Sequence, residues 1–223
     1  MDDERLTGEL QKILTACEER RLTVFVIGAF SVRAYDSLFR ASQDLDLAVT
    51  AEEWPKLKQL LESLGYTVAP EQVWITAVKP VGDGQIEINI ALNGVTDLDS
   101  ATTYPLNLHR PERHQPADLD FPLPVLPLES VLITKLIALR EKDVADLLGI
   151  LIQRGETIRP EQFWQYAGAA DLDRQLRERL RQLIDHLGSG EAISIWYDRT
   201  GTILTDDDRT SMRTVIRRLL KSR

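Results

Sequence analysis

The stretch Arg40-Ala-Ser42-Gln-Asp44-Leu-Asp46-Leu-Ala-Val49 decides the fold of this chain. Leucines alternate with two aspartates, which is typical of a β-strand that has one apolar and one polar face. Asp44 and Asp46 are therefore expected to point the same way. Two neighbouring carboxylates repel each other, and a divalent cation between them relieves that repulsion. The pattern predicts a metal site on the polar face of this strand.

Upstream of the acidic strand, the apolar run Val24-Phe-Val-Ile27 ends at Gly28-Ala29. This predicts a short strand, a turn at Gly28, and a short helix over residues 30–35 whose first amides face whatever the turn holds. A glycine turn of this kind, followed by an acidic strand, is typical of phosphate handling. The first functional hypothesis is Mg²⁺-dependent chemistry on a nucleoside triphosphate.

Downstream, Gln85-Ile-Glu-Ile-Asn-Ile-Ala91 alternates in the same way. The isoleucines would face a core, which sends Glu87 and Asn89 to the opposite face. If this strand lies beside the first, Glu87 completes a site of three acids that would hold two metal ions about 3.5–4 Å apart. Asn89 is neutral and would serve at most as an auxiliary oxygen ligand.

The rest of the chain divides near residue 127. Helical periodicity is expected over residues 6–17 and 51–64, whereas residues 97–127 hold six of the ten prolines and are expected to form a long loop with at most one strand. Beyond residue 128 the apolar pattern is helical, and only residues 193–197 look like a strand. The predicted fold class is α/β (α+β): a mixed sheet with flanking helices over residues 1–127, followed by a mainly helical region over residues 128–223.

Composition restricts the function. Residues 1–127 carry 11 Lys and Arg against 20 Asp and Glu, a net charge of −9 within a total of −8. Such an acidic half disfavours general nucleic-acid binding. The single cysteine, Cys17, excludes an internal disulfide, and no apolar run reaches the roughly 20 residues that span a bilayer. We therefore expect a cytoplasmic protein without a membrane partner.

Four blocks of sequence together resemble the DNA polymerase β-like nucleotidyltransferase superfamily. The nearest likeness is to small bacterial nucleotidyltransferases related to the toxins of type IV abortive-infection systems. The resemblance covers roughly residues 22–152, and the blocks occur in the family's order. They are Gly28-Ala29, Arg40-x-Ser42-x-Asp44-x-Asp46, Ile86-Glu87-Ile88, and the stretch from Pro127 through Lys135 and Asp143 to Asp146.

The resemblance implies transfer of a nucleoside monophosphate from an NTP to an acceptor, with Mg²⁺ or Mn²⁺ as cofactor. The acceptor would be an RNA such as tRNA, a protein or a small molecule. A role as the toxin of a toxin–antitoxin or abortive-infection system, with a cognate antitoxin protein as partner, is implied as well. The implied catalytic residues are Asp44, Asp46, Glu87 and Lys135, of which the three acids would ligate the metal. The implied nucleotide-binding residues are Gly28, Ala29, Arg40, Ser42, Lys135, Asp143 and Asp146.

Other interpretations of the same residues stay open. An Asp-x-Asp pair at a strand end is often merely solvated, and glycosyltransferases also use one to hold a metal and a sugar nucleotide. Lys135 would flank an apolar helix face, and Asp143 with Asp146 would cap the next helix. Because Ala29 and Glu87 depart from the commonest residues of the superfamily, a degenerate module that binds nucleotide or a partner protein is the alternative function.

Two further groups are interpreted as structural. His109 and His114, with Glu112 between them, would bind a metal, but they lack a defined ligand spacing and are assigned to an exposed proline-rich loop. Residues 209–223 hold six basic residues and no acid. They would dock an RNA backbone, although a solvated face over a packed apolar stripe is the commoner outcome.

Overall fold

The computed structural model describes residues 3–36, 42–70, 74–82 and 84–222. The chain forms two compact units. The first comprises Met1–Ala34, Ala41–Thr96 and Pro105–Leu126, and the second comprises Tyr35–Arg40, Asp97–Tyr104 and Pro127–Arg223. That residue 127 separates two independent domains stays a prediction.

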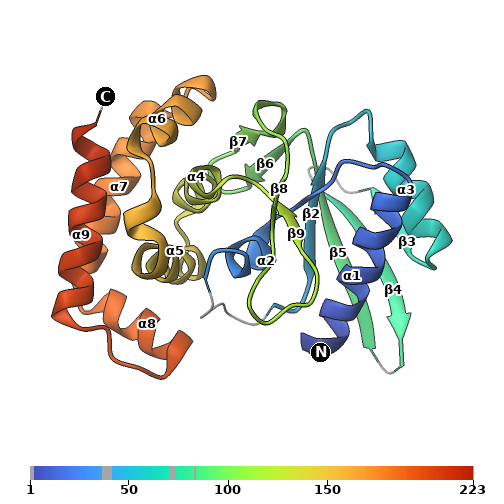
Figure 1. Cartoon of the computed structure of the whole chain (residues 1–223), viewed down its shortest axis with the longest axis horizontal. Helices are drawn as coiled ribbons and strands as arrows, with labels where there is room; N and C mark the ends of the chain where they lie inside the picture. The colour runs from blue at the N-terminus through green and yellow to red at the C-terminus, as the bar shows by residue number, and fades with distance from the viewer. Residues whose placement is uncertain (1–2, 37–41, 71–73, 83, 223) are drawn as a thin grey trace. The chain divides into compact units, whose positions relative to one another are not determined.

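The first unit is built on a mixed sheet in which seven strands of the described chain follow the order β3-β4-β5-β2-β1-β9-β8 (Figure 1). The central strands β2 and β5 run parallel, while β4 is antiparallel to β5. The strands are β1 (Phe25–Val26), β2 (Leu45–Val49), β3 (Thr67–Pro70), β4 (Ile75–Val81), β5 (Gly84–Leu92), β8 (Glu112–His114) and β9 (Leu123–Val125).

Alternation of side chains explains how β2 and β5 present their polar residues. Leu45 and Leu47 on β2 and the isoleucines of β5 are at most 1% exposed, so they form the core beneath the sheet. The residues between them, Asp46, Glu87 and Asn89, are half-buried. Because the strand period is two, these polar side chains share the opposite face. This much of the predicted arrangement is confirmed.

Three helices complete the first unit: α1 (Asp3–Glu19), α2 (Gly28–Arg33) and α3 (Trp54–Ser63). Helices α1 and α3 lie beside each other (Figure 1), and each buries a stripe of leucine at helical spacing. Glu9 on α1 joins the helix to the sheet, since it accepts hydrogen bonds from Tyr66 and from Lys79 on β4.

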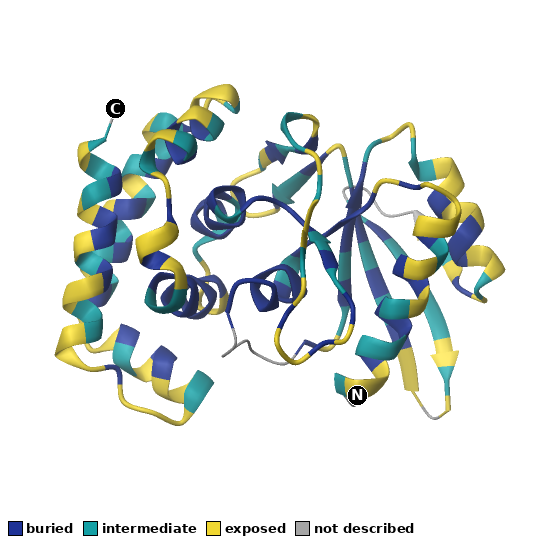
Figure 2. Ribbon diagram, in the orientation of Figure 1, coloured by how far each residue is buried: buried dark blue, intermediate teal, exposed yellow. Residues whose placement is uncertain are grey.

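The second unit is largely helical. Its helices are α4 (Leu128–Ala138), α5 (Glu141–Arg154), α6 (Pro160–Ala169), α7 (Asp173–Gly188), α8 (Glu191–Thr200) and α9 (Asp206–Lys221). Figure 2 shows α4 buried along most of its length, whereas α6, α7 and α9 are buried on one side and exposed on the other. A helix that is apolar nearly all round is stable only in a core, and α5, α6 and α7 pack against α4.

The structure confirms the α/β (α+β) class and corrects two local expectations. Residues 193–197 lie in α8 and not in a strand, because the buried residues Ala192, Ile195 and Trp196 recur at helical spacing. The stretch from 97 to 127 holds more than the one strand expected. It contributes β8 and β9 to the main sheet and most of a two-stranded sheet formed by β6 (Gly94–Asp97) and β7 (Thr102–Pro105). Two 3₁₀ turns, Leu106–Leu108 and Gly155–Thr157, complete the elements.

None of the described helices combines the length and the apolar character that crossing a membrane requires.

Candidate functional site

Gly28 is the residue that shapes the turn between β1 and α2. Its φ of +65° lies in the left-handed region, which residues with a Cβ rarely adopt. A Cβ built on Gly28 would also overlap with the Oδ2 atom of Asp46. The backbone is closed further by a hydrogen bond of 2.9 Å from the Ile27 N–H to the Asp46 carbonyl. The glycine turn and the acidic strand, which the sequence predicts to act together, are therefore in contact.

Asp44 and Asp46 are linked by the side chain of Asn89 on the neighbouring strand. The amide nitrogen of Asn89 donates to Asp44 Oδ2 at 3.0 Å and to Asp46 Oδ1 at 3.2 Å. The parallel register pairs Asp46 with Asn89 directly, which places the amide on the same face as the carboxylates. The Ser42 hydroxyl donates to the other oxygen of Asp44 at 2.9 Å. Neutral donors thus hold the acid pair together.

The oxygen atoms of this pair suit a divalent cation. Carboxylate oxygens are the ligands that Mg²⁺ prefers in proteins, and both aspartates are half-buried rather than sealed in the core. The turn at Gly28 lies directly against the Asp46 carboxylate, which a residue with a Cβ at this position would displace. The donor set therefore fits the metal that the resemblance implies.

Glu87 occupies the expected face but is not gathered with the two aspartates. In the parallel pairing of β2 with β5, Leu45 lies opposite Ile88. Glu87 precedes Ile88, and it therefore lies at the level of Asp44. Among the described residues, however, no three His, Cys, Asp or Glu side chains are close enough to share a metal ion. The role of Glu87 as third acid stays a prediction. Arg40, which was expected to bind nucleotide, lies outside the described residues.

In the second unit, Lys135, Asp143 and Asp146 do come together. The Lys135 ammonium lies 2.7 Å from Asp146 and 3.3 Å from Asp143, and all three residues are buried. Asp143 also accepts a hydrogen bond from the backbone N–H of Arg140, the residue before α5, as the capping interpretation expects. These contacts unite the predicted residues in one ion-pair cluster, and their role toward a nucleotide stays a prediction.

The cluster extends to two residues that sequence reasoning missed, Asp36 and Arg199. Their side chains form an ion pair in which both are at most 2% exposed, and Arg199 also lies 3.8 Å from Asp146. Gln153 donates to Asp36 at 2.8 Å. Acids and bases therefore alternate along the cluster, and its three acids and three bases make it formally neutral. The order is Asp36, Arg199, Asp146, Lys135, Asp143 and Arg140. We name this cluster the buried network; it comprises Asp36, Lys135, Arg140, Asp143, Asp146 and Arg199.

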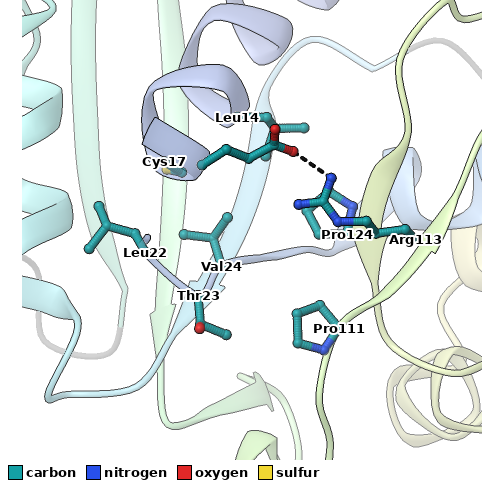
Figure 3. A pocket seen from close by; sticks show the side chains of 9 residues that line it. Leu14, Cys17, Leu22, Thr23, Val24, Pro111, Arg113 and Pro124 are labelled. Carbon is teal, nitrogen blue, oxygen red and sulfur yellow. Dashed lines mark hydrogen bonds and ion pairs between the residues drawn. The ribbon is translucent and has the colours of Figure 1, made fainter. Parts of the chain in front are cut away.

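A small cavity in the first unit contains none of the predicted site residues (Figure 3). Its volume is about 150 Å³, and an ion pair of 2.5 Å between Arg113 and Glu18 lies beside it. Cys17 lines this cavity, and burial raises the pKa of its thiol to about 12. The thiol is therefore protonated near neutral pH and is a poor nucleophile. The cavity offers no chemistry to the site.

The groups interpreted as structural make structural contacts. His114 pairs with Glu112 at 3.2 Å within β8. On α9, Arg209 and Arg213 donate to the carbonyl of Leu187 near the end of α7, and Arg218 donates to two carbonyls, those of Gly155 and Ile158. Basic side chains that satisfy the last carbonyls of a helix stabilise packing. These contacts favour the packing interpretation of the basic C-terminal segment over RNA docking.

No protein-family model matches this chain, and no curated protein does so either. Among solved structures, JHP933 from Helicobacter pylori is similar over 96% of this chain and 92% of its own, with 12% identity and a TM-score of 0.54. The "putative nucleotidyltransferase" from H. pylori is similar over 98% of this chain and 93% of its own, with 12% identity and a TM-score of 0.52.

The solution structure of the antibiotic-resistance factor ANT(2'')-Ia covers 84% of this chain and 97% of its own, at 18% identity. Its TM-score of 0.43 is too low to carry weight. The two likenesses with a TM-score above 0.5 show that this chain shares its fold with these structures, one of which is described as a nucleotidyltransferase.

Proposed function

We propose that this protein is a nucleotidyltransferase that moves a nucleoside monophosphate from an NTP to an acceptor, with Mg²⁺ or Mn²⁺ as cofactor. One observation carries the proposal. On a sheet of nucleotidyltransferase fold, Asp46 of the Asp44–Asp46 pair lies so close to Gly28 that no side chain fits at the glycine position. A phosphate-binding turn directly against a cation-binding pair is what triphosphate chemistry requires.

The roles follow from these positions. Asp44 and Asp46 would hold the metal ion, which when bound supplies positive charge to the triphosphate oxygens. Gly28 and Ala29 would offer backbone N–H groups to the phosphates. In the reaction an acceptor oxygen bonds to the α-phosphorus while the bond to pyrophosphate breaks. We assign the acceptor's proton to Glu87, which stands on the same face of β5. Catalysis of this kind rests on positioning and electrostatics.

Lys135, Asp143 and Asp146 enter the proposal as nucleotide-binding residues on the strength of the resemblance, together with Arg40 and Ser42. Ion pairs with two buried carboxylates hold the Lys135 ammonium in one place. A fixed charge costs no reorganisation when a substrate arrives. For the acceptor we propose the classes that the family implies, an RNA such as tRNA, a protein or a small molecule, in the cytoplasm and with an antitoxin protein as regulator.

The decisive experiment is incubation of the protein with each α-labelled NTP, Mg²⁺ or Mn²⁺, and separate pools of tRNA and protein. We expect label transfer with release of pyrophosphate. The Asp44→Ala/Asp46→Ala double variant should remain folded by circular dichroism yet transfer no label. Equal label transfer by the double variant and the unmodified protein would refute the assignment.

A second function is favoured by one observation, the lack of a three-acid cluster among the described residues. A module that kept the fold and lost catalysis would bind NTP and Mg²⁺ without turnover. Calorimetry paired with a pyrophosphate assay separates the two functions. Saturable binding of NTP with no pyrophosphate in any acceptor pool would establish the module.

A further inference from the structure

The side-chain amide of Asn89 links Asp44 and Asp46, the two residues that would hold the cation. One nitrogen of its amide donates to an oxygen of each aspartate, at 3.0 and 3.2 Å. An Asn side chain carries two N–H donors on that nitrogen, so a single group serves both carboxylates. The amide therefore offsets, in the metal-free protein, the repulsion that two adjacent carboxylates would otherwise suffer.

Only one orientation of the amide suits the two carboxylates when no metal ion lies between them. If the side chain turned by half a rotation, its Oδ1 atom would face both acids, and three oxygen atoms carrying negative charge would converge. A divalent cation reverses this preference, because a carbonyl oxygen is a ligand for Mg²⁺ whereas an N–H₂ group is not. The preferred orientation of Asn89 thus depends on whether a cation is present.

The backbone around Asn89 confines that change to the side chain. Asn89 lies within β5, paired with Asp46 on one side and with Thr76 on the other. Its neighbours Ile88 and Ile90 are fully buried. The last torsion of an Asn side chain is broad and roughly two-fold, so rotation of the amide needs no movement of the strand.

We propose that Asn89 is a metal-responsive switch, which bridges Asp44 and Asp46 through its N–H₂ group in the metal-free protein and turns its Oδ1 toward them when a divalent cation binds. This inference rests on the proposed function, because it assigns the cation to the Asp44–Asp46 pair. It adds a residue that is neither an acid nor a matched position of the family likeness. It also explains how the pair remains ordered before a metal arrives.

The composition of the chain makes the switch directly observable. The protein has three asparagines, Asn89, Asn93 and Asn107. Selective ¹⁵N-asparagine labelling would therefore yield three side-chain amide pairs in an NMR spectrum, and Asn89→Ala would identify one of them. Asn93 accepts a hydrogen bond from the Ala51 N–H at 2.8 Å, and Asn107 is exposed, so these two serve as internal references.

Titration with Mg²⁺ alone, to millimolar concentrations and without NTP, is the test. We expect both N–H₂ protons of Asn89 to start downfield, as donors to carboxylates, and to move upfield as Mg²⁺ saturates the site. The amides of Asn93 and Asn107 should stay in place. An Asn89 amide that does not respond to Mg²⁺, either alone or with NTP present, would overturn the switch.

A charge-matched pair of variants gives a second measurement. Asn89→Asp supplies an oxygen ligand that needs no rotation, so calorimetry should show Mg²⁺ bound about tenfold more tightly than by the unmodified protein. Asn107→Asp adds the same charge at an exposed position and should change the affinity little. If the two variants bind Mg²⁺ equally, Asn89 does not face the cation.

Failure of the switch and failure of the proposed function are distinguishable. The amide response is read without NTP or acceptor, whereas the function is read as label transfer. Label transfer with an unresponsive Asn89 would remove the switch and leave the enzyme. A responsive Asn89 without label transfer in any acceptor pool would leave the switch in a metal-binding module.

Discussion

The two charged clusters of this protein differ in balance and exposure. The Asp44–Asp46 pair is half-buried, carries two like charges and is held by neutral donors from Asn89 and Ser42. The buried network is sealed from solvent except at the exposed Arg140, and it alternates acids with bases, so that its formal charges cancel. Like charges that lie side by side attract a cationic ligand, whereas opposite charges that pair with each other hold parts of the fold together.

The largest difference between an effect on activity and an effect on folding stability is expected from Asp46→Asn. Removing one metal ligand should lower nucleotidyl transfer about a thousandfold, since a metal supplies several kcal/mol to the transition state. The free energy of unfolding without metal should stay the same or rise by about 1 kcal/mol, because like-charge repulsion is relieved. Label transfer and urea unfolding measure the two effects. A strongly destabilised variant would place Asp46 among residues that the fold itself requires.

Unlike Asp46→Asn, the Lys135→Met substitution should strongly lower the free energy of unfolding. It leaves two buried carboxylates without their shared cation, and breaking a buried pair in this way costs about 3 kcal/mol of folding stability. Lys58→Met is the matched control, because Lys58 lies on the surface of α3 and pairs with Glu62 at 3.9 Å. Exposed pairs of this kind contribute at most about 1 kcal/mol. Similar losses in the two variants, measured by urea unfolding, would contradict the contrast.

Two glycines test how tightly the buried network is packed without any change of charge. Gly149 in α5 faces Asp36 and Arg199, and a Cβ there would overlap with the Asp36 carboxylate. Gly149→Ala should destabilise the protein by about 2 kcal/mol through overpacking, although alanine is the better helix former. Gly8 in α1 has nothing within 4 Å, so Gly8→Ala should stabilise by about 0.5 kcal/mol. Thermal unfolding of both variants measures these changes in stability. If both variants were stabilised, or both destabilised, this packing account would be refuted.

The smallest effect is expected at Glu9, a compensated acid in the first unit. Burial alone would raise the pKa of Glu9, but hydrogen bonds and charges from Lys12 and Lys79 outweigh it, and the pKa falls below the ordinary value of 4.5. A depressed pKa stabilises the fold above pH 4.5, and this stabilisation disappears as pH falls through the depressed value.

Glu9→Gln should therefore be less stable than the unmodified protein at neutral pH and equal to it in acid. The free energy of unfolding as a function of pH measures the difference. A gap between the two proteins that stays constant down to strongly acidic pH would show that the Glu9 charge is not its cause.

Local patterns predicted much of the fold. Alternation in β2 and β5 placed Asp44, Asp46, Glu87 and Asn89 on one face, and the apolar run before Gly28 located the turn. Register between strands was not visible in the sequence. The pairing of Asp46 with Asn89 therefore emerged only from the structure, as did the separation of Glu87 from the two aspartates.

The buried network was predicted only in part for a related reason. Lys135, Asp143 and Asp146 lie close together in sequence on two successive helices, so periodicity and the family likeness singled them out. Asp36 and Arg199 are separated by 163 residues, and neither belongs to a motif. Their pairing depends on tertiary packing around Gly149, which no local signal reports. In the same way, residues 193–197 look like a strand in the sequence. The burial of Ala192 and Trp196 at helical spacing, which only the structure shows, places them in a helix.

The most direct measurement is calorimetric titration of Mg²⁺ together with NTP into the unmodified protein and into the Asp44→Asn/Asp46→Asn double variant. A metal site at the Asp44–Asp46 pair predicts saturable, metal-dependent NTP binding in the unmodified protein and none in the double variant, with both proteins equally folded. Equal metal-dependent binding by the two proteins would contradict it.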